Sequence, residues 1–218
     1  MSQRVKICGI KTAAIMRAAV DAGAEYVGLV FFPKSPRYVA LAHAKELAAI
    51  TEGKACVVAL MVDPTDDEAA EVCKALKPSY LQLQGEESPD RVRAIREIVE
   101  TPIIKAIAVR TKIDAARAIE YRGCVDLILF DAKPPLGSVL PGGNGQSFDW
   151  TVLADMRREF PFMLGGGLTP ANVRAAIDTC DPMIVDVSSG VETAPGVKDA
   201  GLIRAFIAAA KSTHRAAG

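Results

Sequence analysis

Two residues at the ends of apolar runs have side chains suited to proton transfer. Cys8 follows a run that begins at Arg4, and Asp131 closes one that begins at Asp126. A thiolate accepts a proton and a carboxylic acid donates one, so the two form an acid–base pair if they flank one small substrate. Alternation places Lys6 on the same face as Cys8, where its charge favours the thiolate. The pair suggests a proton shuttle, a reaction type that needs no metal.

Both residues also have a structural interpretation. A single cysteine in an apolar run is usually a small buried hydrophobic residue. An aspartate at a strand end can simply anchor the loop after it, although Asp131 shares the alternation phase of Leu127 and Leu129. The catalytic interpretation therefore requires a fold that brings Cys8 and Asp131 to one opening.

Eight strand-then-helix units follow one another along the 218 residues, at about 27 residues each. Such alternation predicts an α/β fold with a parallel sheet, and eight units predict a single-domain (β/α)8 TIM barrel over residues 1–218. A doubly wound open sheet is the alternative, and the lack of a G-x-G-x-x-G motif after the first strand disfavours it. The expected strands span residues 4–10, 26–32, 55–62, 80–84, 103–109, 126–131, 162–164 and 183–187. The expected helices span residues 13–22, 41–51, 65–76, 112–121 and 200–210, and others begin at 88, at 149 and after 170.

Glycine-rich turns follow the last two expected strands. Barrel enzymes often bind phosphate where these two turns meet, through backbone N–H groups and hydroxyls. Glycine also permits tight turns without any ligand, but two such turns at these positions favour a phosphate site. A glycine-rich stretch inside the long loop 132–148 is a weaker candidate for a third wall. The predicted phosphate-binding residues are Gly143, Gly145, Gly166, Gly167, Ser188, Ser189 and Gly190.

Three further residues are candidates for substrate binding. Arg37 lies on a proline-rich loop after the second strand, where it either recognises a carboxylate or phosphate or stays solvated. Gln84 and its neighbour Gln82 face the lumen, and they bind either the substrate or each other. Asp186 also faces the lumen, where it contacts substrate or orients its neighbours.

Composition excludes several classes of function. The formal net charge of +0 and the pI of about 6.7 disfavour a nucleic-acid or acidic-membrane partner. The five cysteines form no C-x-x-C pair and no metal-ligand spacing with His43 and His214, so we expect a reducing compartment and no metal site. Since no apolar run reaches about 18 residues and no leader precedes the first strand, we expect a cytoplasmic protein.

Seven segments of the chain together resemble the phosphoribosylanthranilate isomerase family. They run in order along almost the whole sequence, although Gln84 and Asn144 stand where family members often carry histidine and threonine. Both residues can still form hydrogen bonds. The matching segments are 6–10, 28–32 with 35–37, 81–85, 130–131, 142–150, 165–168 and 185–192.

The resemblance implies an enzyme of tryptophan biosynthesis that acts on a small phosphosugar. Its reaction is the Amadori rearrangement of N-(5-phosphoribosyl)anthranilate to 1-(2-carboxyphenylamino)-1-deoxyribulose 5-phosphate, without cofactor. We expect a monomer or small homo-oligomer. By the motif match, Cys8 is the general base, Asp131 is the general acid and Arg37 is the partner of the anthranilate carboxylate. Asp131 then needs a raised pKa, from burial or a nearby negative charge.

Two alternatives remain at this stage. A two-phosphate sugar isomerase of histidine biosynthesis does similar chemistry with carboxylates on the first and fifth strands, but these strands offer Cys8 and no acid. A non-catalytic phosphosugar-binding barrel would need the glycine-rich turns without the Cys8–Asp131 pair.

Overall fold

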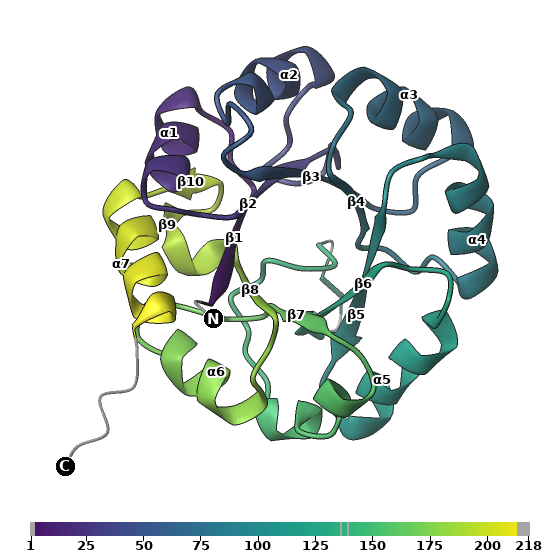
Figure 1. Cartoon of the computed structure of the whole chain (residues 1–218), viewed down its shortest axis with the longest axis vertical. Coiled ribbons are helices and arrows are strands. Elements are labelled where there is room, and N and C mark those ends of the chain that lie inside the picture. Colours follow the sequence, from purple (N-terminus) through teal and green to yellow (C-terminus); the bar gives the residue numbers. More distant parts are fainter. Residues whose placement is uncertain (1–2, 136, 139, 213–218) are drawn as a thin grey trace.

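The computed structural model describes residues 3–135, 137–138 and 140–212. Eight parallel strands, β1 to β8, close into a barrel in chain order, and helices surround it (Figure 1). The predicted α/β TIM barrel is therefore confirmed, while the single-domain boundary of 1–218 includes residues outside the described ranges and stays a prediction. Within those ranges, no helix is long and apolar enough to cross a membrane.

The elements alternate as the sequence predicts. The strands are β1 (Arg4–Cys8), β2 (Tyr26–Val30), β3 (Cys56–Met61), β4 (Tyr80–Leu83), β5 (Ile103–Val109), β6 (Leu127–Ala132), β7 (Phe162–Leu164) and β8 (Ile184–Val187). The α-helices are α1 (Ala13–Asp21), α2 (Leu41–Ala49), α3 (Asp66–Leu76), α4 (Pro89–Ile98), α5 (Lys112–Ala116), α6 (Val173–Cys180) and α7 (Ala200–Lys211). Single 3-10 turns are η1 (Arg117–Tyr121), η2 (Trp150–Leu153), η3 (Met156–Arg158) and η4 (Ser189–Val191), and β9 (Glu192–Ala194) pairs with β10 (Val197–Lys198) in a small antiparallel ribbon.

Side-chain caps explain where several helices begin. Thr12, Ser88 and Asp199 each accept a hydrogen bond from a backbone N–H in the first turn of α1, α4 and α7. Thr65 forms a capping box with Glu68 at the start of α3. Such caps satisfy N–H groups that have no partner inside the helix.

The expected helix from Asp149 is wrong in type. Asp149 does cap the segment, because its carboxylate accepts hydrogen bonds from Thr151, but the chain forms the short 3-10 turns η2 and η3. Pro161 lies just before β7 and disfavours helical backbone in the residue before it, which explains where the segment ends but not why it is 3-10. The expected helix 112–121 likewise changes from α to 3-10 at Arg117.

The first strand is shorter than expected. It ends at Cys8 because Gly9 adopts a φ of 79°, a conformation that favours glycine. The Gly9 N–H then donates to the carbonyl of Gly28 on β2. This turn holds the thiol of Cys8 at the mouth of the barrel.

Strand alternation separates two apolar layers. Outward-facing residues such as Val5 and Ile7 join the large core between barrel and helices. The lumen below the mouth is filled by another apolar cluster, so the barrel is a packed core and not a channel. The buried members of this inner cluster are Tyr26, Val58, Ile104, Ala106, Leu127, Leu129, Met163 and Ile184.

A buried ion pair fixes the ends of β3, β4 and β5 beside this mouth. Lys105 Nζ lies 3.0 Å from Glu87 Oε2, and both side chains are almost wholly buried. Lys105 donates to the carbonyls of Gly85 and Ala106 at 2.8 Å each. Glu87 Oε1 accepts from the N–H groups of Asp63 and Gly85. The pair therefore ties the loops after β3 and β4 to β5.

We predict that Lys105→Met lowers the free energy of unfolding by about 3–5 kcal/mol, because it leaves the Glu87 carboxylate buried without its cation. Chemical denaturation measures the loss. Arg93→Met is the matched control, since Arg93 pairs with Asp90 on the surface and should cost less than about 1 kcal/mol. Equal small losses in both variants would contradict a stabilising role for Lys105.

Candidate active site

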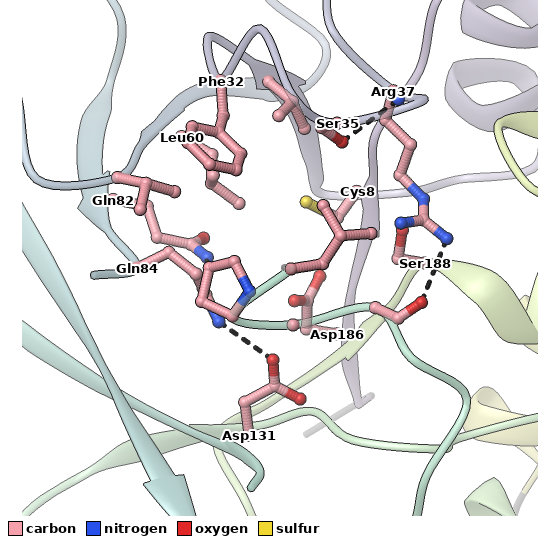
Figure 2. Close-up of a pocket in the computed structure, with 16 residues that line it drawn as sticks. Cys8, Phe32, Ser35, Arg37, Leu60, Gln82, Gln84, Asp131, Asp186 and Ser188 are labelled. Atoms are coloured by element: carbon pink, nitrogen blue, oxygen red, sulfur yellow. Dashed lines mark hydrogen bonds between the residues drawn. The ribbon is translucent and has the colours of Figure 1, made fainter. Parts of the chain in front are cut away.

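A pocket at the carboxyl ends of the strands contains both predicted catalytic residues. Cys8 from β1 and Asp131 from β6 line it, together with Arg37, Gln84 and Asp186 (Figure 2). The barrel thus brings together the residues that the sequence proposed as acid, base and substrate contacts. The rest of the wall is mostly apolar, with the side chains of Val30, Phe32, Leu60, Val62, Leu140 and Pro141.

A second pocket adjoins the first on the side of β7 and β8. It is lined by most of the predicted phosphate-binding residues, namely Gly143, Gly145, Gly166, Gly167, Ser188 and Ser189. Asp131, Asp186, Ser188 and Gly143 line both pockets. A ligand with an apolar end and an anionic end can therefore lie across the two pockets, with its centre beside Asp131 and Asp186.

The turn after β7 is shaped to present backbone N–H groups. The Asn172 side chain holds it, since Oδ1 accepts from Thr169 N–H at 2.7 Å and Nδ2 donates to the Gly167 carbonyl at 3.0 Å. Among the described residues, the N–H groups of Gly166 and Gly167 have no hydrogen-bond partner. Such free amides suit an anion.

Gly190 is the one predicted phosphate residue that is not among those lining this pocket. A Cβ at Gly190 would lie 1.8 Å from the Leu168 carbonyl oxygen. Glycine is therefore required at position 190 because the two turns approach each other closely, and not because it contacts a ligand.

A buried ion pair lies between the predicted acid and base. Lys6 on β1 and Asp186 on β8 are paired in register, and their side chains form an ion pair of 3.0 Å. The Lys6 side chain is fully buried. Burial alone would lower the pKa of Lys6, but the charges of Asp186 and Cys8 reverse this and raise it. Lys6 therefore remains a cation under the floor of the pocket.

Asp131 has the raised pKa that a general acid requires. Burial is the main cause and the charge of Asp186 adds to it, so the pKa of Asp131 rises to about 6. Hydrogen bonds from Ala132 N–H at 2.9 Å and from Gln84 Nε2 at 2.9 Å oppose the rise, because they favour the carboxylate. Asp131 thus exchanges its proton close to neutral pH.

Cys8 departs from the expectation that Lys6 would ionise it. The Lys6 charge does lower the pKa of Cys8, as does that of Lys198, but burial is the larger effect and the pKa ends above its usual value. Space beside the thiol comes from Gly28, where a Cβ would lie 2.7 Å from Cys8 Sγ. In the ligand-free protein Cys8 is therefore a thiol held beside two cations.

Arg37 is buried, so its interpretation as a solvated surface arginine is wrong. Its Nε and Nη2 donate to the two carboxylate oxygens of Glu192 at 2.8 Å each, and Nη2 also donates to the Gly143 carbonyl at 3.2 Å. Glu192 in turn pairs with buried Lys198. One edge of the guanidinium is therefore already occupied, and Nη1 has no hydrogen-bond partner among the described residues.

Gln84 links the β4 end to Asp131, since its Nε2 donates to Asp131 Oδ2 and its Oε1 accepts from Gln82 (Figure 2). Gly142, which the sequence placed only in a weaker third wall of the phosphate site, lies directly over this bond. A Cβ there would be 2.6 Å from Asp131 Oδ2 and 2.8 Å from Gln84 Nε2. The long loop therefore covers the predicted acid through a residue without a side chain.

Sequence reasoning also missed Gly28, Glu192 and Lys198. Gly28 and Glu192 stood inside matching segments but had no role assigned, and Lys198 carries no local signal of function. No group of three or more His, Cys, Asp or Glu side chains in the described part of the chain is placed to hold a metal ion. His43 lies on the surface with Glu46, and His214 lies outside the described residues.

Comparison with known proteins points to one family. A family model described as N-(5′-phosphoribosyl)anthranilate (PRA) isomerase matches residues 5–209. The N-(5′-phosphoribosyl)anthranilate isomerase of Rhodopseudomonas palustris strain BisB5 is 50% identical over 214 residues, which cover 98% of each chain. The corresponding protein of Paramagnetospirillum magneticum is 49% identical and is covered to 98%.

Solved structures agree with this similarity. The phosphoribosylanthranilate isomerase of Thermotoga maritima superposes with a TM-score of 0.87 at 38% identity, over 96% of this chain and 98% of that one. Another phosphoribosylanthranilate isomerase, crystallised with reduced 1-(o-carboxyphenylamino)-1-deoxyribulose 5-phosphate, gives a TM-score of 0.84 at 37% identity with the same coverage.

The raised pKa of Asp131 predicts a pH-dependent stability. The folded protein holds this proton more tightly than the unfolded chain, so the contribution of Asp131 is complete below about pH 4 and is lost as the pH rises through about 6. The two pKa values differ by about two, which corresponds to at most about 3 kcal/mol. Asp131→Asn should therefore gain stability relative to wild type between pH 4 and 7.

Urea denaturation of both proteins across this range measures the difference. Asp90→Asn is the control, because Asp90 is an exposed carboxylate on α4. A difference between Asp131→Asn and wild type that is constant with pH would contradict the raised pKa.

Proposed function

This chain belongs to the N-(5′-phosphoribosyl)anthranilate isomerase family, and we propose that it catalyses the isomerisation of N-(5-phosphoribosyl)anthranilate in tryptophan biosynthesis. The product is 1-(2-carboxyphenylamino)-1-deoxyribulose 5-phosphate, formed by an Amadori rearrangement. The proposal assigns the two proton transfers to Asp131 as general acid and Cys8 as general base.

The observation that carries this proposal is that two adjoining pockets share Asp131, Asp186 and Ser188. The apolar pocket, with Phe32 and Leu60, suits an aromatic ring. The glycine-rich pocket suits a phosphate. The sugar between them would then lie where the pockets meet, beside the acid and facing Cys8.

The first step opens the sugar ring. Asp131 donates its proton to the ring oxygen, the bond from that oxygen to C1′ breaks, and the nitrogen lone pair forms the C=N bond of an iminium cation. A pKa near the working pH suits this donor. Substrate phosphate in the adjoining pocket adds a negative charge near Asp131, which raises its pKa further and increases the protonated fraction.

The second step removes the proton from C2′. In the free protein the pKa of Cys8 is raised, but the iminium cation formed in the first step lowers it, because a nearby positive charge favours the thiolate. Lys6 and Lys198 act in the same direction. The thiolate takes the C2′ proton, the electron pair of the C2′–H bond forms the C1′=C2′ bond, and the π electrons of the C=N bond return to nitrogen. The resulting enolamine tautomerises to the ketone.

Arg37 is assigned to the anthranilate carboxylate. The bond to Glu192 fixes the guanidinium plane, so the substrate would meet Nη1 and not a free bidentate fork. Because Arg37 also holds the Gly143 carbonyl, the same side chain connects the apolar pocket to the loop over Asp131. Gln84 and Asp186 are assigned to substrate contact and to the electrostatics of Asp131.

The alternatives from the sequence differ in what they require. A two-phosphate isomerase would need a second phosphate site opposite the first, where the pocket is walled by apolar side chains such as Val30 and Leu60. A purely binding barrel would not need Asp131 to have a raised pKa beside Cys8. A coupled assay with freshly prepared phosphoribosylanthranilate tests the proposed function, and absence of turnover would contradict it.

The catalytic assignments predict a large effect on rate. Cys8→Ala and Asp131→Asn should each lower kcat by about two to four orders of magnitude, as is usual for a general acid or base. The double variant should lose far less than the product of the two losses if the residues act on one proton pathway. Steady-state kinetics and circular dichroism separate lost catalysis from lost folding.

Cys56→Ala serves as the control, because Cys56 lies at the start of β3, at the opposite end of the barrel from the pocket. Its kcat should stay near that of wild type. A near-normal kcat for Cys8→Ala would return Cys8 to a structural role.

The phosphate assignment predicts that Ser189→Asp raises both KM for the substrate and the inhibition constant of inorganic phosphate, by about tenfold or more, through like-charge repulsion. Gly166→Asp is a poor test, since a Cβ at Gly166 would lie 2.4 Å from Ala132 N and disturb the fold. Inhibition by phosphate and substrate kinetics measure the two constants. An increase in neither would place the phosphate elsewhere.

A further inference from the structure

Two glutamines form a hydrogen-bonded chain that ends at the predicted acid. Gln82 Nε2 donates to Gln84 Oε1 at 2.6 Å, and Gln84 Nε2 donates to Asp131 Oδ2 at 2.9 Å. Both side chains are at least nine-tenths buried. Figure 2 shows the two amides side by side on the pocket wall, with Gln84 directed toward Asp131.

At the Gln82 end, this series of hydrogen bonds stops at an atom without a partner. Gln82 lines the apolar pocket, and its Oε1 is buried with no hydrogen-bond partner among the described residues. A buried acceptor without a partner is unfavourable. Its position in the pocket wall offers it to an N–H or O–H group of a bound ligand.

The direction of the chain suits only one protonation state of Asp131. A carboxylate accepts hydrogen bonds and cannot donate, so Gln84 must present Nε2 to it. A protonated Oδ2 donates, so Gln84 must present Oε1 instead. Its Nε2 then faces Gln82, which must accept in turn, and Gln82 is left with Nε2 directed away from Gln84. The other oxygen, Oδ1, already accepts from Ala132 N–H in either state.

We propose that Gln82 and Gln84 form a two-state relay whose direction follows the proton on Asp131. With Asp131 as carboxylate, Gln82 offers an acceptor to the pocket, and with Asp131 protonated it offers a donor. The catalytic meaning rests on the proposed function: the proton transfer that creates the iminium also converts Gln82 to the acceptor that an iminium N–H requires. Gln82 is thus assigned as a residue that contacts the reacting iminium.

Other charged groups face Asp131, and their effects on the glutamine amides must be distinguished from the effect of the Asp131 proton. Asp186 on β8 and Lys6 on β1 act on its charge, and the thiol of Cys8 lines the same pocket. The segments beside it on β5 and β7, around Ala108 and Gly165, bring no titratable side chain. A test therefore has to distinguish titration of Asp131 from that of its charged neighbours.

Nitrogen-15 NMR of the glutamine side-chain amides in the ligand-free protein provides this test. Signals are assigned by their loss in Gln82→Leu and Gln84→Leu. Between pH 4.5 and 8, both amides should shift with one common midpoint, equal to that of the Asp131 carboxyl carbon. In Asp131→Asn neither amide should titrate. Gln3, whose amide donates to the Pro182 carbonyl at the other end of the barrel, is the control and should not respond.

Gln84→Leu removes the middle member of the hydrogen-bonded series from Gln82 to Asp131. Asp131 should still titrate, with its midpoint raised by about one pH unit because a donor to the carboxylate is lost, while the Gln82 amide stops responding. In the assay, Gln82→Leu should lower kcat about tenfold with little change in KM, since its acceptor is needed after ring opening. A glutamine that only supports the fold would not produce this separation of kcat from KM.

A titration of Gln84 alone would overturn the relay, and so would amide titrations that persist in Asp131→Asn. Because the NMR measurement needs no substrate, the relay and the proposed isomerase function can be rejected independently of each other. Coupled amide shifts in a protein without isomerase activity would keep the relay and reject the proposed function.

Discussion

The active site depends on one buried ion pair, Lys6 with Asp186. The two residues face each other in register on β1 and β8 and both point into the lumen. Because the lumen below is apolar, their charges are poorly screened and act on both neighbours. Asp186 holds the pKa of Asp131 up, and Lys6 opposes the effect of burial on Cys8. Asp186 also raises the pKa of Cys8 and Lys6 also lowers that of Asp131, so this one ion pair acts on both the predicted acid and the predicted base.

Two further buried ionic groups hold this arrangement in place. Glu87 and Lys105 fasten the strand ends around Gln84 from outside the barrel, and Glu192 fixes Arg37 from the ribbon after β8. Removing water from such groups is costly unless they are paired and hydrogen-bonded. Their positions around the pocket fit a site whose polar atoms must keep their directions before the substrate arrives.

Much of the site was predictable because a strand has a period of two. Once the barrel is assumed, alternation directs Lys6, Cys8, Asp131 and Asp186 into the lumen, and strand ends define the mouth. The ion pair between Arg37 and Glu192 was not predictable. The two residues lie 155 positions apart, and the ribbon of β9 and β10 brings them together only in the folded protein. Gly28 similarly matters only through its register with Cys8.

Asp131 owes its raised pKa first to burial and then to the charge of Asp186. A carbon-13 NMR titration of the Asp131 carboxyl in Asp186→Asn, compared with wild type, tests it directly. We expect a midpoint near pH 6 in wild type and a clearly lower one in the variant, because the raising effect of Asp186 exceeds the lowering effect of Lys6. An unchanged or higher midpoint in Asp186→Asn would contradict the account.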